Sequence, residues 1–195
     1  GHDVVVGTRD PAATAQRNVL FRIVAERHPE LTLTTFAEAV PAADLVVNAI
    51  SGPRCVGALT PLAPSLDRRT VMDVSSPFDF STDDVVLDPV NTDSLGEQLQ
   101  RALPGARVVK TLNTLAADVM TNPTAAGGGD HSVFVSGEDT GAKAMVADLL
   151  RSLGWNDVID LGGIRTARAT EMMLPMWMAL SGAVSTHLFG FKIVR

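Results

Sequence analysis

Short apolar runs rich in β-branched residues recur along the chain, and segments with helical spacing separate most of them. The runs that predict strands are residues 4–6, 31–34, 45–49, 70–74, 107–111, 132–135 and 158–160. Strands that alternate with helices form a mainly parallel sheet, with right-handed crossovers and helices on both faces. The pattern therefore predicts an α/β fold with a doubly wound, mainly parallel sheet.

Local signals mark where several helices begin and end. Residues 35–38 and 94–97 have the spacing of a capping box, in which a hydroxyl and a carboxylate bind backbone amides at a helix N-terminus. A third helix is expected to start after Asp139 and to end at Gly154, which favours the left-handed conformation of a C-terminal cap.

The alternation of strands and helices extends to about Leu161, so residues 1–161 are expected to form one domain. Residues 162–195 have a different pattern, which predicts one long apolar helix and a short extended tail at residues 191–194. The chain is therefore expected to combine a sheet domain with a short C-terminal helical extension.

Composition narrows the possible classes of function. The formal charge is −6 at pH 7 and no basic stripe is present, so nucleic acid is not an expected partner. The longest apolar stretch, residues 172–184, contains Pro175 and is shorter than the roughly 18 residues of a membrane span, so no membrane partner is expected. Cys55 is the only cysteine and is expected to be a buried packing residue rather than a nucleophile. The lack of a disulfide framework or a signal-peptide pattern predicts a cytoplasmic protein.

Candidate binding residues lie at the ends of the predicted strands, because ligands of open α/β sheets bind there. The first strand leads into Thr8 and Arg9, where an NAD site usually has an Asp or Glu for the ribose 2′-hydroxyl. A hydroxyl and a guanidinium suit a 2′-phosphate, which predicts a preference for NADP. The alternative is a simple turn, in which Asp10 caps the next helix and Pro11 opens it.

The third predicted strand ends in a second candidate segment. Asn48, Ala49, Ile50 and Ser51 lead into Gly52, and small residues there allow the backbone to approach a flat ligand closely. The structural alternative for Asn48 is a turn amide whose hydrogen bonds are satisfied within the protein, and without further context that alternative is favoured.

The fifth predicted strand ends in a third candidate segment, Asn113 and Thr114. The Asn113 amide can donate and accept at once, which suits the orientation of a carboxamide or a ring carbonyl. Its structural alternative is to cap the helix that follows.

Motifs for other chemistries do not occur in the sequence. There is no G-x-G-x-x-G turn, and the glycines at 127–129 precede a predicted strand rather than a helix. The four histidines lack metal-ligand spacing, so no metal site is expected. Hydrolase and kinase motifs are also missing, and no catalytic side chain is predicted. The methionines and Trp177 within residues 172–178 predict core packing or a subunit interface, or alternatively a soft wall for a planar ring.

Five segments, residues 1–11, 109–114, 133–139, 167–171 with 174–177, and 191–195, together resemble the F420-dependent NADP oxidoreductase family. The resemblance covers nearly the whole chain in order. It implies a Rossmann-like NADP-binding domain at residues 1–161, and a C-terminal element at residues 162–195 that serves a homodimer or the acceptor site. The implied reaction is hydride transfer between NADPH and a small-molecule acceptor, either the deazaflavin coenzyme F-420 (F420) or a flavin.

The resemblance also implies roles for the candidate residues. Thr8 and Arg9 would contact the 2′-phosphate, residues 49–51 would lie beside the nicotinamide, and Asn113 with Thr114 would lie near the facing ring. Two alternatives stay open. One is a non-catalytic NADP-sensing domain; the other is an imine or pyrroline-carboxylate reductase, although such enzymes need a larger helical dimerisation domain than the residues after Gly162 provide.

The sequence departs from the family at one diagnostic feature, the first strand with its Gly-rich turn. We expect a gap in the sheet between the strands at residues 4–6 and 45–49, where that strand normally lies. The turn also supplies a helix N-terminus for the pyrophosphate, so residues 1–195 alone are expected to bind a dinucleotide weakly or not at all. Because the sequence opens without Met, it is expected to be a fragment of a longer protein.

Overall fold

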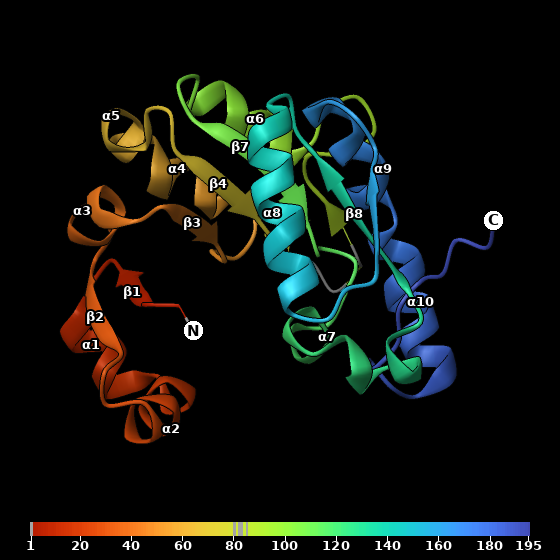
Figure 1. Cartoon of the computed structure of the whole chain (residues 1–195), viewed down its shortest axis with the longest axis horizontal. Helices are drawn as coiled ribbons and strands as arrows, with labels where there is room; N and C mark the ends of the chain where they lie inside the picture. Colours follow the sequence, from red (N-terminus) through yellow and green to blue (C-terminus); the bar gives the residue numbers. More distant parts are fainter. Residues whose placement is uncertain (1, 80, 82–83, 85) are drawn as a thin grey trace.

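A five-stranded sheet forms the main body of the protein (Figure 1). The computed structural model describes residues 2–79, 81, 84 and 86–195; Gly1, which opens the first segment of the family resemblance, lies outside them. The strand order is β3 (Leu45–Asn48), β4 (Thr70–Asp73), β7 (Arg107–Thr111), β8 (Ser132–Ser136) and β9 (Asp157–Asp160). Neighbouring strands are parallel except β7 and β8, which are antiparallel. The predicted α/β class and the mainly parallel sheet are confirmed.

Helices cover both faces of this sheet. One hydrophobic cluster includes residues of α4 (Arg54–Leu59), α5 (Ala63–Leu66) and α6 (Leu95–Ala102). A second includes residues of α7 (Ala117–Thr121) and α8 (Thr140–Ser152), which lies in front of the sheet in Figure 1. In β7, Val108 belongs to the first cluster and Val109 to the second, because successive side chains of a strand point to opposite faces. The predicted doubly wound arrangement is therefore confirmed.

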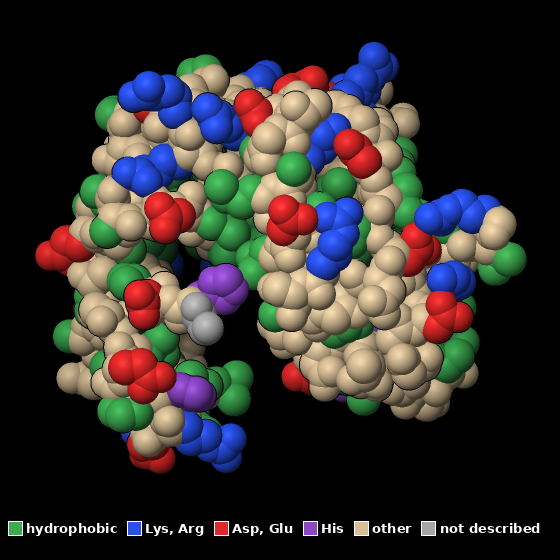
Figure 2. Space-filling view, viewed as in Figure 1, with side chains coloured by type: hydrophobic (Ala, Val, Ile, Leu, Met, Phe, Trp, Pro, Cys, Tyr) green, Lys and Arg blue, Asp and Glu red, His purple; other side chains and the backbone are tan. Residues whose placement is uncertain are grey.

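The N-terminal part forms a separate, smaller sheet. Here β1 (Val5–Thr8) pairs in parallel with β2 (Thr32–Thr35), beside α1 (Pro11–Arg17), α2 (Val19–Arg27) and α3 (Phe36–Ala39). Among the described residues no strand pairing joins β1 to β3. Val5 in β1 and Val47 in β3 are consequently 47% and 52% exposed, and the space-filling view shows the two parts on either side of an open gap (Figure 2). The expected gap in the sheet is confirmed.

The predicted caps are largely present. Thr35 and Glu38 form a complete capping box on α3. Ser94 caps α6 by accepting from the Glu97 amide, while the Glu97 carboxylate accepts from the Ser94 hydroxyl and from Arg168. The helix after Asp139 is α8, and Gly154 beyond its end has a φ of +101°, as a left-handed cap requires.

The C-terminal segment differs from the single long helix that the apolar pattern predicts. It contains α9 (Ala167–Met172) and α10 (Leu174–Val184), with Pro175 at the start of α10. A proline lacks an amide hydrogen, so it is tolerated in the first turn of a helix but not within one. The predicted tail extends along β8, where the Ser132 amide donates to the Phe191 carbonyl at 2.7 Å and the Ile193 amide donates to the Ser132 hydroxyl.

Shorter elements complete the described chain. A two-stranded antiparallel pair, β5 (Phe78–Asp79) with β6 (Val86–Leu87), was not predicted because each strand is only two residues long. The 3-10 turns are η1 (Val40–Ala42), η2 (Thr60–Leu62), η3 (Pro123–Ala125), η4 (Gly127–Gly129) and η5 (Ile164–Thr166). No helix in the described part of the chain is long and apolar enough to cross a membrane.

Candidate functional site

The first candidate residues, Thr8 and Arg9, line an open hollow of about 740 Å³ at the end of β1. Its other lining residues come from α1 and the start of α2, and they include Asp10, Thr14 and Arg17. Neither arginine has a carboxylate within ion-pair distance among the described residues. Two guanidinium groups without carboxylate partners at one hollow suit the binding of a phosphate.

The structural alternative for this turn, a helix cap, is confirmed, and the phosphate-binding role of Thr8 and Arg9 stays a prediction. The Asp10 carboxylate caps α1 by accepting from the Ala13 amide at 2.9 Å, and Pro11 is the first residue of the helix. The Thr8 and Thr14 hydroxyls are hydrogen-bonded at 2.8 Å. The cap fixes where α1 begins, so it positions the side chains that line the hollow rather than competing with them.

The loop after β3 is held by the side chain of Asn48. Asn48 is buried; its amide group donates to Asp73 at 2.8 Å and accepts from the Ile50 amide at 3.2 Å. These are the contacts of the satisfied turn amide that the sequence left as the alternative. Ala49 and Ser51 are exposed and Ile50 is half-buried, so the accessible surface of this segment comes from these three residues and not from Asn48.

Gly52 permits the sharp bend at the end of this loop. Its φ is +60°, a region that side chains disfavour, and a Cβ at this position would lie 3.2 Å from the Phe78 carbonyl oxygen. The loop therefore approaches the β5 segment closely.

The segment after β7 makes a tight and strained turn. The Asn113 amide donates to the Thr111 carbonyl at 2.8 Å, and Leu112 between them has a φ of +60°. Asn113 and Thr114 are buried, and the Asn113 side chain donates to the Thr170 carbonyl at 3.0 Å. The alternative in which Asn113 caps the following helix is wrong, because the N-cap position of α7 is Ala116.

A buried cluster of charged side chains, which was not predicted from the sequence, adjoins these strand ends. The Lys110 ammonium lies 3.0 Å from a carboxylate oxygen of Asp73 and 3.0 Å from one of Glu171. Burial alone would lower the pKa of Lys110, but attraction to Asp73 and Glu171 raises its pKa above the ordinary value. Burial raises the pKa of Glu171, because the ammonium and two amide donors offset the loss of solvent only in part. Because the two carboxylates raise its pKa, Lys110 stays charged.

Cys55 lies beside this cluster and has the structural role that was expected. It is fully buried, with its sulfur 3.8 Å from the Ser75 hydroxyl oxygen. Burial raises the pKa of the Cys55 thiol, so the thiol stays protonated and is a poor nucleophile.

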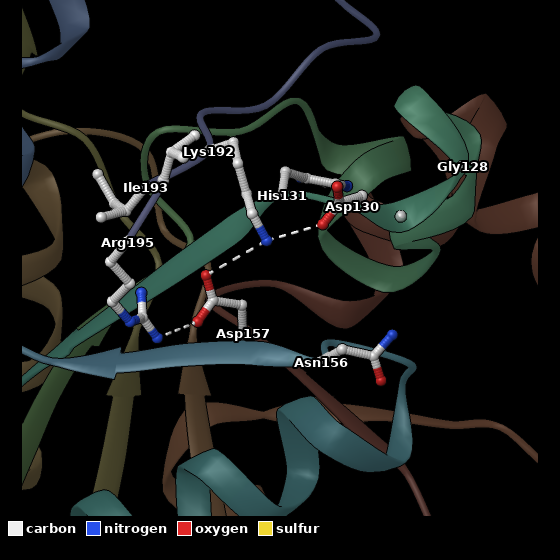
Figure 3. A pocket seen from close by; sticks show the side chains of 10 residues that line it. Gly128, Asp130, His131, Asn156, Asp157, Lys192, Ile193 and Arg195 are labelled. Atoms are coloured by element: carbon white, nitrogen blue, oxygen red, sulfur yellow. Dashed lines mark hydrogen bonds and ion pairs between the residues drawn. The ribbon is translucent and has the colours of Figure 1, made fainter.

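A second hollow, of about 500 Å³, lies between the C-terminal tail and the start of β9 (Figure 3). Lys192 pairs with Asp130 at 2.7 Å, and Arg195 pairs with Asp157 at 2.7 Å. None of the predicted site residues lines this hollow. The charged side chains that line this hollow neutralise one another. Their ion pairs hold the tail against the rest of the chain and leave no net charge to attract a charged ligand.

His131, beside the same hollow, has a structural role. It is 4% exposed, its Nε2 lies 2.8 Å from the Pro123 carbonyl oxygen, and its ring packs edge-on against Trp155. No group of three or more potential metal ligands is found among the described residues.

The structure therefore assembles the predicted residues at three separate strand ends. Thr8 and Arg9 lie in the smaller sheet, whereas the segments beginning at Asn48 and Asn113 lie in the main sheet. The sequence prediction missed Arg17, Lys110, Asp73 and Glu171. For Arg17 a signal existed, since a helix opening at Pro11 places residues three and four apart on one face.

Comparison with known proteins gives two informative relatives. A crystal structure from Arthrobacter sp. FB24, of a protein assigned as an F420-dependent NADP reductase, is 52% identical with a TM-score of 0.96. The match covers 100% of this chain and 90% of that one. The F420-dependent NADP reductase of Methanothermobacter marburgensis is 23% identical over 188 residues, which are 93% of this chain and 82% of the relative.

More distant structures share the fold alone. The imine reductase of Bacillus cereus has a TM-score of 0.59 at 16% identity, and the match covers 95% of this chain but 55% of that one. No family model matches the chain.

Proposed function

This chain belongs to the F420-dependent NADP reductase family and is an NADP-dependent oxidoreductase, and from that premise we propose that it transfers a hydride between NADPH and the deazaflavin F420. A flavin is the alternative acceptor. The observation that carries the proposal is the hollow at the end of β1, because it offers two arginines that have no carboxylate partner among the described residues, where an adenosine ribose would lie.

Thr8, Arg9 and Arg17 would bind the 2′-phosphate of NADPH. Arg9 follows β1 directly, and Arg17 reaches the same hollow from the last turn of α1. Both arginines present forked donors that match phosphate oxygens, and the Thr8 hydroxyl adds a neutral donor. The residues present fit this end of the cofactor.

The loops after β3 and β7 would hold the reacting rings. When bound, the two cofactors supply the hydride donor and the hydride acceptor themselves. The protein needs only to hold the rings in close register and to exclude water, so no acidic or basic side chain is required for the transfer. The exposed, small residues Ala49 and Ser51 suit a flat ring, while the buried Asn113 and Thr114 would fix the facing segment.

The cofactor preference is tested by calorimetric titration of NADPH and NADH into the full-length protein, which the later tests also use. We expect Arg9→Ala to weaken NADPH binding by about 10-fold to 100-fold. This range corresponds to the loss of a hydrogen bond to a charged group, which contributes about 1.5–3 kcal/mol. NADH binding should not change. Arg22→Ala serves as the control, since Arg22 is exposed on α2 and does not line the hollow. Equal affinities for the two cofactors, or an unchanged Arg9→Ala variant, would refute the assignment.

Turnover distinguishes the proposed reaction from its alternatives. NADPH oxidation is followed by absorbance with F420 or with a flavin as acceptor. Faster oxidation with F420 supports the proposal, and faster oxidation with the flavin identifies the alternative acceptor. Bound NADPH that is not oxidised by either acceptor would indicate the non-catalytic NADP-sensing domain.

We also propose that the protein is a homodimer and that α10 forms its interface. Only Leu174 of this apolar helix is buried, whereas Met176 and Val184 are 58% and 53% exposed. A helix that is apolar on all sides is normally covered, and a second copy of the chain would cover it.

A further inference from the structure

The cluster of Lys110, Asp73 and Glu171 is the most deeply buried group of charges that the structure describes. Their side chains are 0%, 0% and 2% exposed, and they come from β7, β4 and α9. The Lys110 ammonium also donates to the Ser75 carbonyl at 2.6 Å. Removing three charges from water is costly, and apolar residues of similar volume often stabilise a fold equally well. The cluster therefore calls for an explanation other than stability.

Hydrogen bonds through Asp73 and Asn48 connect the cluster to the loop after β3. One Asp73 oxygen accepts from Lys110, and the other accepts from the Asn48 side chain at 2.8 Å. Asn48 in turn accepts from the Ile50 amide, which lies within the loop. Asp73 also accepts from the amide and the hydroxyl of Ser75, so its position is fixed from several directions. An unbroken chain of hydrogen bonds thus joins Lys110 to the loop at residues 49–51.

The other side of the cluster leads to the segment after β7. Glu171 accepts from the backbone amides of Leu95 and Gly96 at 2.8 and 3.1 Å, which anchors α9 to the N-terminus of α6. Thr170, the neighbour of Glu171 on α9, accepts from the Asn113 side chain through its carbonyl. Lys110 itself lies two residues before Leu112, the residue with the strained φ.

We propose that Lys110 is a positioning residue that sets the distance between the loop at residues 49–51 and the segment at residues 112–114. This inference rests on the proposed function, in which these two segments hold the reacting rings. Lys110 touches neither ring and acts through Asp73 and Asn48 on one side and through Glu171 and α9 on the other. Its ammonium contacts both branches of the network, through Asp73 and through Glu171.

The first test replaces Lys110 with Met, which removes the ammonium group and keeps an unbranched side chain of similar shape. We expect kcat for NADPH oxidation to fall by about 10-fold to 100-fold, since small displacements of reacting groups have effects of that size. The dissociation constant for NADPH should change less than about twofold, because Thr8 and Arg9 lie in the other sheet. Amide hydrogen exchange should become faster at residues 49–51 and 112–114.

Two further variants separate positioning from folding. Lys143→Met is the matched control, because Lys143 is also buried and ion-paired, to Asp160 at 2.8 Å, but belongs to α8. The second is a neutral triple variant, Lys110→Met with Asp73→Asn and Glu171→Gln, which leaves no buried unpaired charge in the cluster. We expect it to melt close to the unmodified protein and still show the reduced kcat and the faster loop exchange.

A triple variant with the original kcat and loop exchange would overturn the inference, as would the same losses in Lys143→Met. Failure of the proposed function has a different result: the unmodified protein would not oxidise NADPH with either acceptor. In that case the positioning role of Lys110 is judged from amide hydrogen exchange alone. Unchanged exchange at residues 49–51 and 112–114 in Lys110→Met would still contradict that role.

Discussion

Arg17 adds a second guanidinium group to the hollow at the end of β1. It lines the same hollow as Thr8 and Arg9, although it lies eight residues further along the chain than Arg9. Asp10 and Pro11 fix the first turn of α1, and this determines which face the later residues present. Arg17 could therefore have been predicted from the cap and the helical period.

We expect Arg17→Ala to lower the affinity for NADPH about tenfold, because it removes a charged donor from the 2′-phosphate while leaving NADH binding unchanged. Arg17→Lys keeps the charge but loses the forked geometry, and it should have an intermediate effect. The measurement is the ratio of dissociation constants for NADPH and NADH. An Arg17→Ala variant with the unmodified ratio would exclude Arg17 from the phosphate site.

For the two asparagines, the sequence predicts the position in the fold but not the hydrogen-bond partner. Asn48 and Asn113 were correctly placed at strand ends, but their side chains bind within the protein. Their partners, Asp73 and Thr170, lie 25 and 57 residues away along the chain. Neither spacing nor local pattern indicates such contacts, because they depend on how β4 and α9 pack against the strand ends.

At the scale of elements, the α3 capping box links local sequence to pH dependence. Glu38 accepts from the hydroxyls of Thr34 and Thr35 and from the Thr35 amide, and these bonds lower its pKa from 4.5 to about 2. A carboxylate with a lowered pKa contributes stability above its unfolded pKa, and this contribution is lost as the pH falls from 4.5 to about 2.

Glu38→Gln should therefore lower the thermal unfolding midpoint at pH 7, and its difference from the unmodified protein should shrink below pH 4.5 and be lost as the pH falls through about 2. Thr34→Val removes one of the three donors and should raise the Glu38 pKa only part of the way, as NMR titration of the carboxyl would report. A difference in midpoint that stays constant from pH 7 to pH 2 would contradict the role of the capping box.

Element types proved more predictable than element boundaries and directions. The apolar runs located the strands of the five-stranded sheet and of the smaller sheet to within one or two residues. The direction of β8 could not be predicted, since parallel and antiparallel strands share the same alternation of side chains. The division between α9 and α10 did have a signal in Pro175, but the continuous apolar character around it concealed the break.

At the scale of the whole molecule, the two sheets separate the two ends of the proposed cofactor site. The hollow with Arg9 belongs to the smaller sheet, and the loops proposed to hold the rings belong to the main sheet. Local sequence pattern alone would suggest one continuous sheet. The gap between β1 and β3 was expected only because the family resemblance placed another strand there.

The apolar helix α10 leads to a prediction about assembly. Met172, Met176, Met178 and Val184 are 40% to 58% exposed, and Trp177 stacks on Phe189 of the tail with ring centroids 5.4 Å apart. The predicted core role of this methionine cluster therefore does not describe its exposed members, and the subunit interface stays a prediction. If two copies pair through α10, the protein should sediment at about twice its monomer mass of 20.6 kDa.

Met176→Asp should convert that dimer to a monomer, because a carboxylate at the centre of an apolar interface loses its hydration without gaining a partner. Central interface residues contribute about 2 kcal/mol or more, so the dissociation constant should rise by at least about 30-fold. Met145→Asp is the control, since Met145 is 45% exposed on α8, away from the proposed interface. Sedimentation velocity over a range of concentrations checks both variants. An unmodified protein that remains monomeric would contradict the proposed dimer. A Met176→Asp variant that stays dimeric while Met145→Asp dissociates would place the interface away from α10.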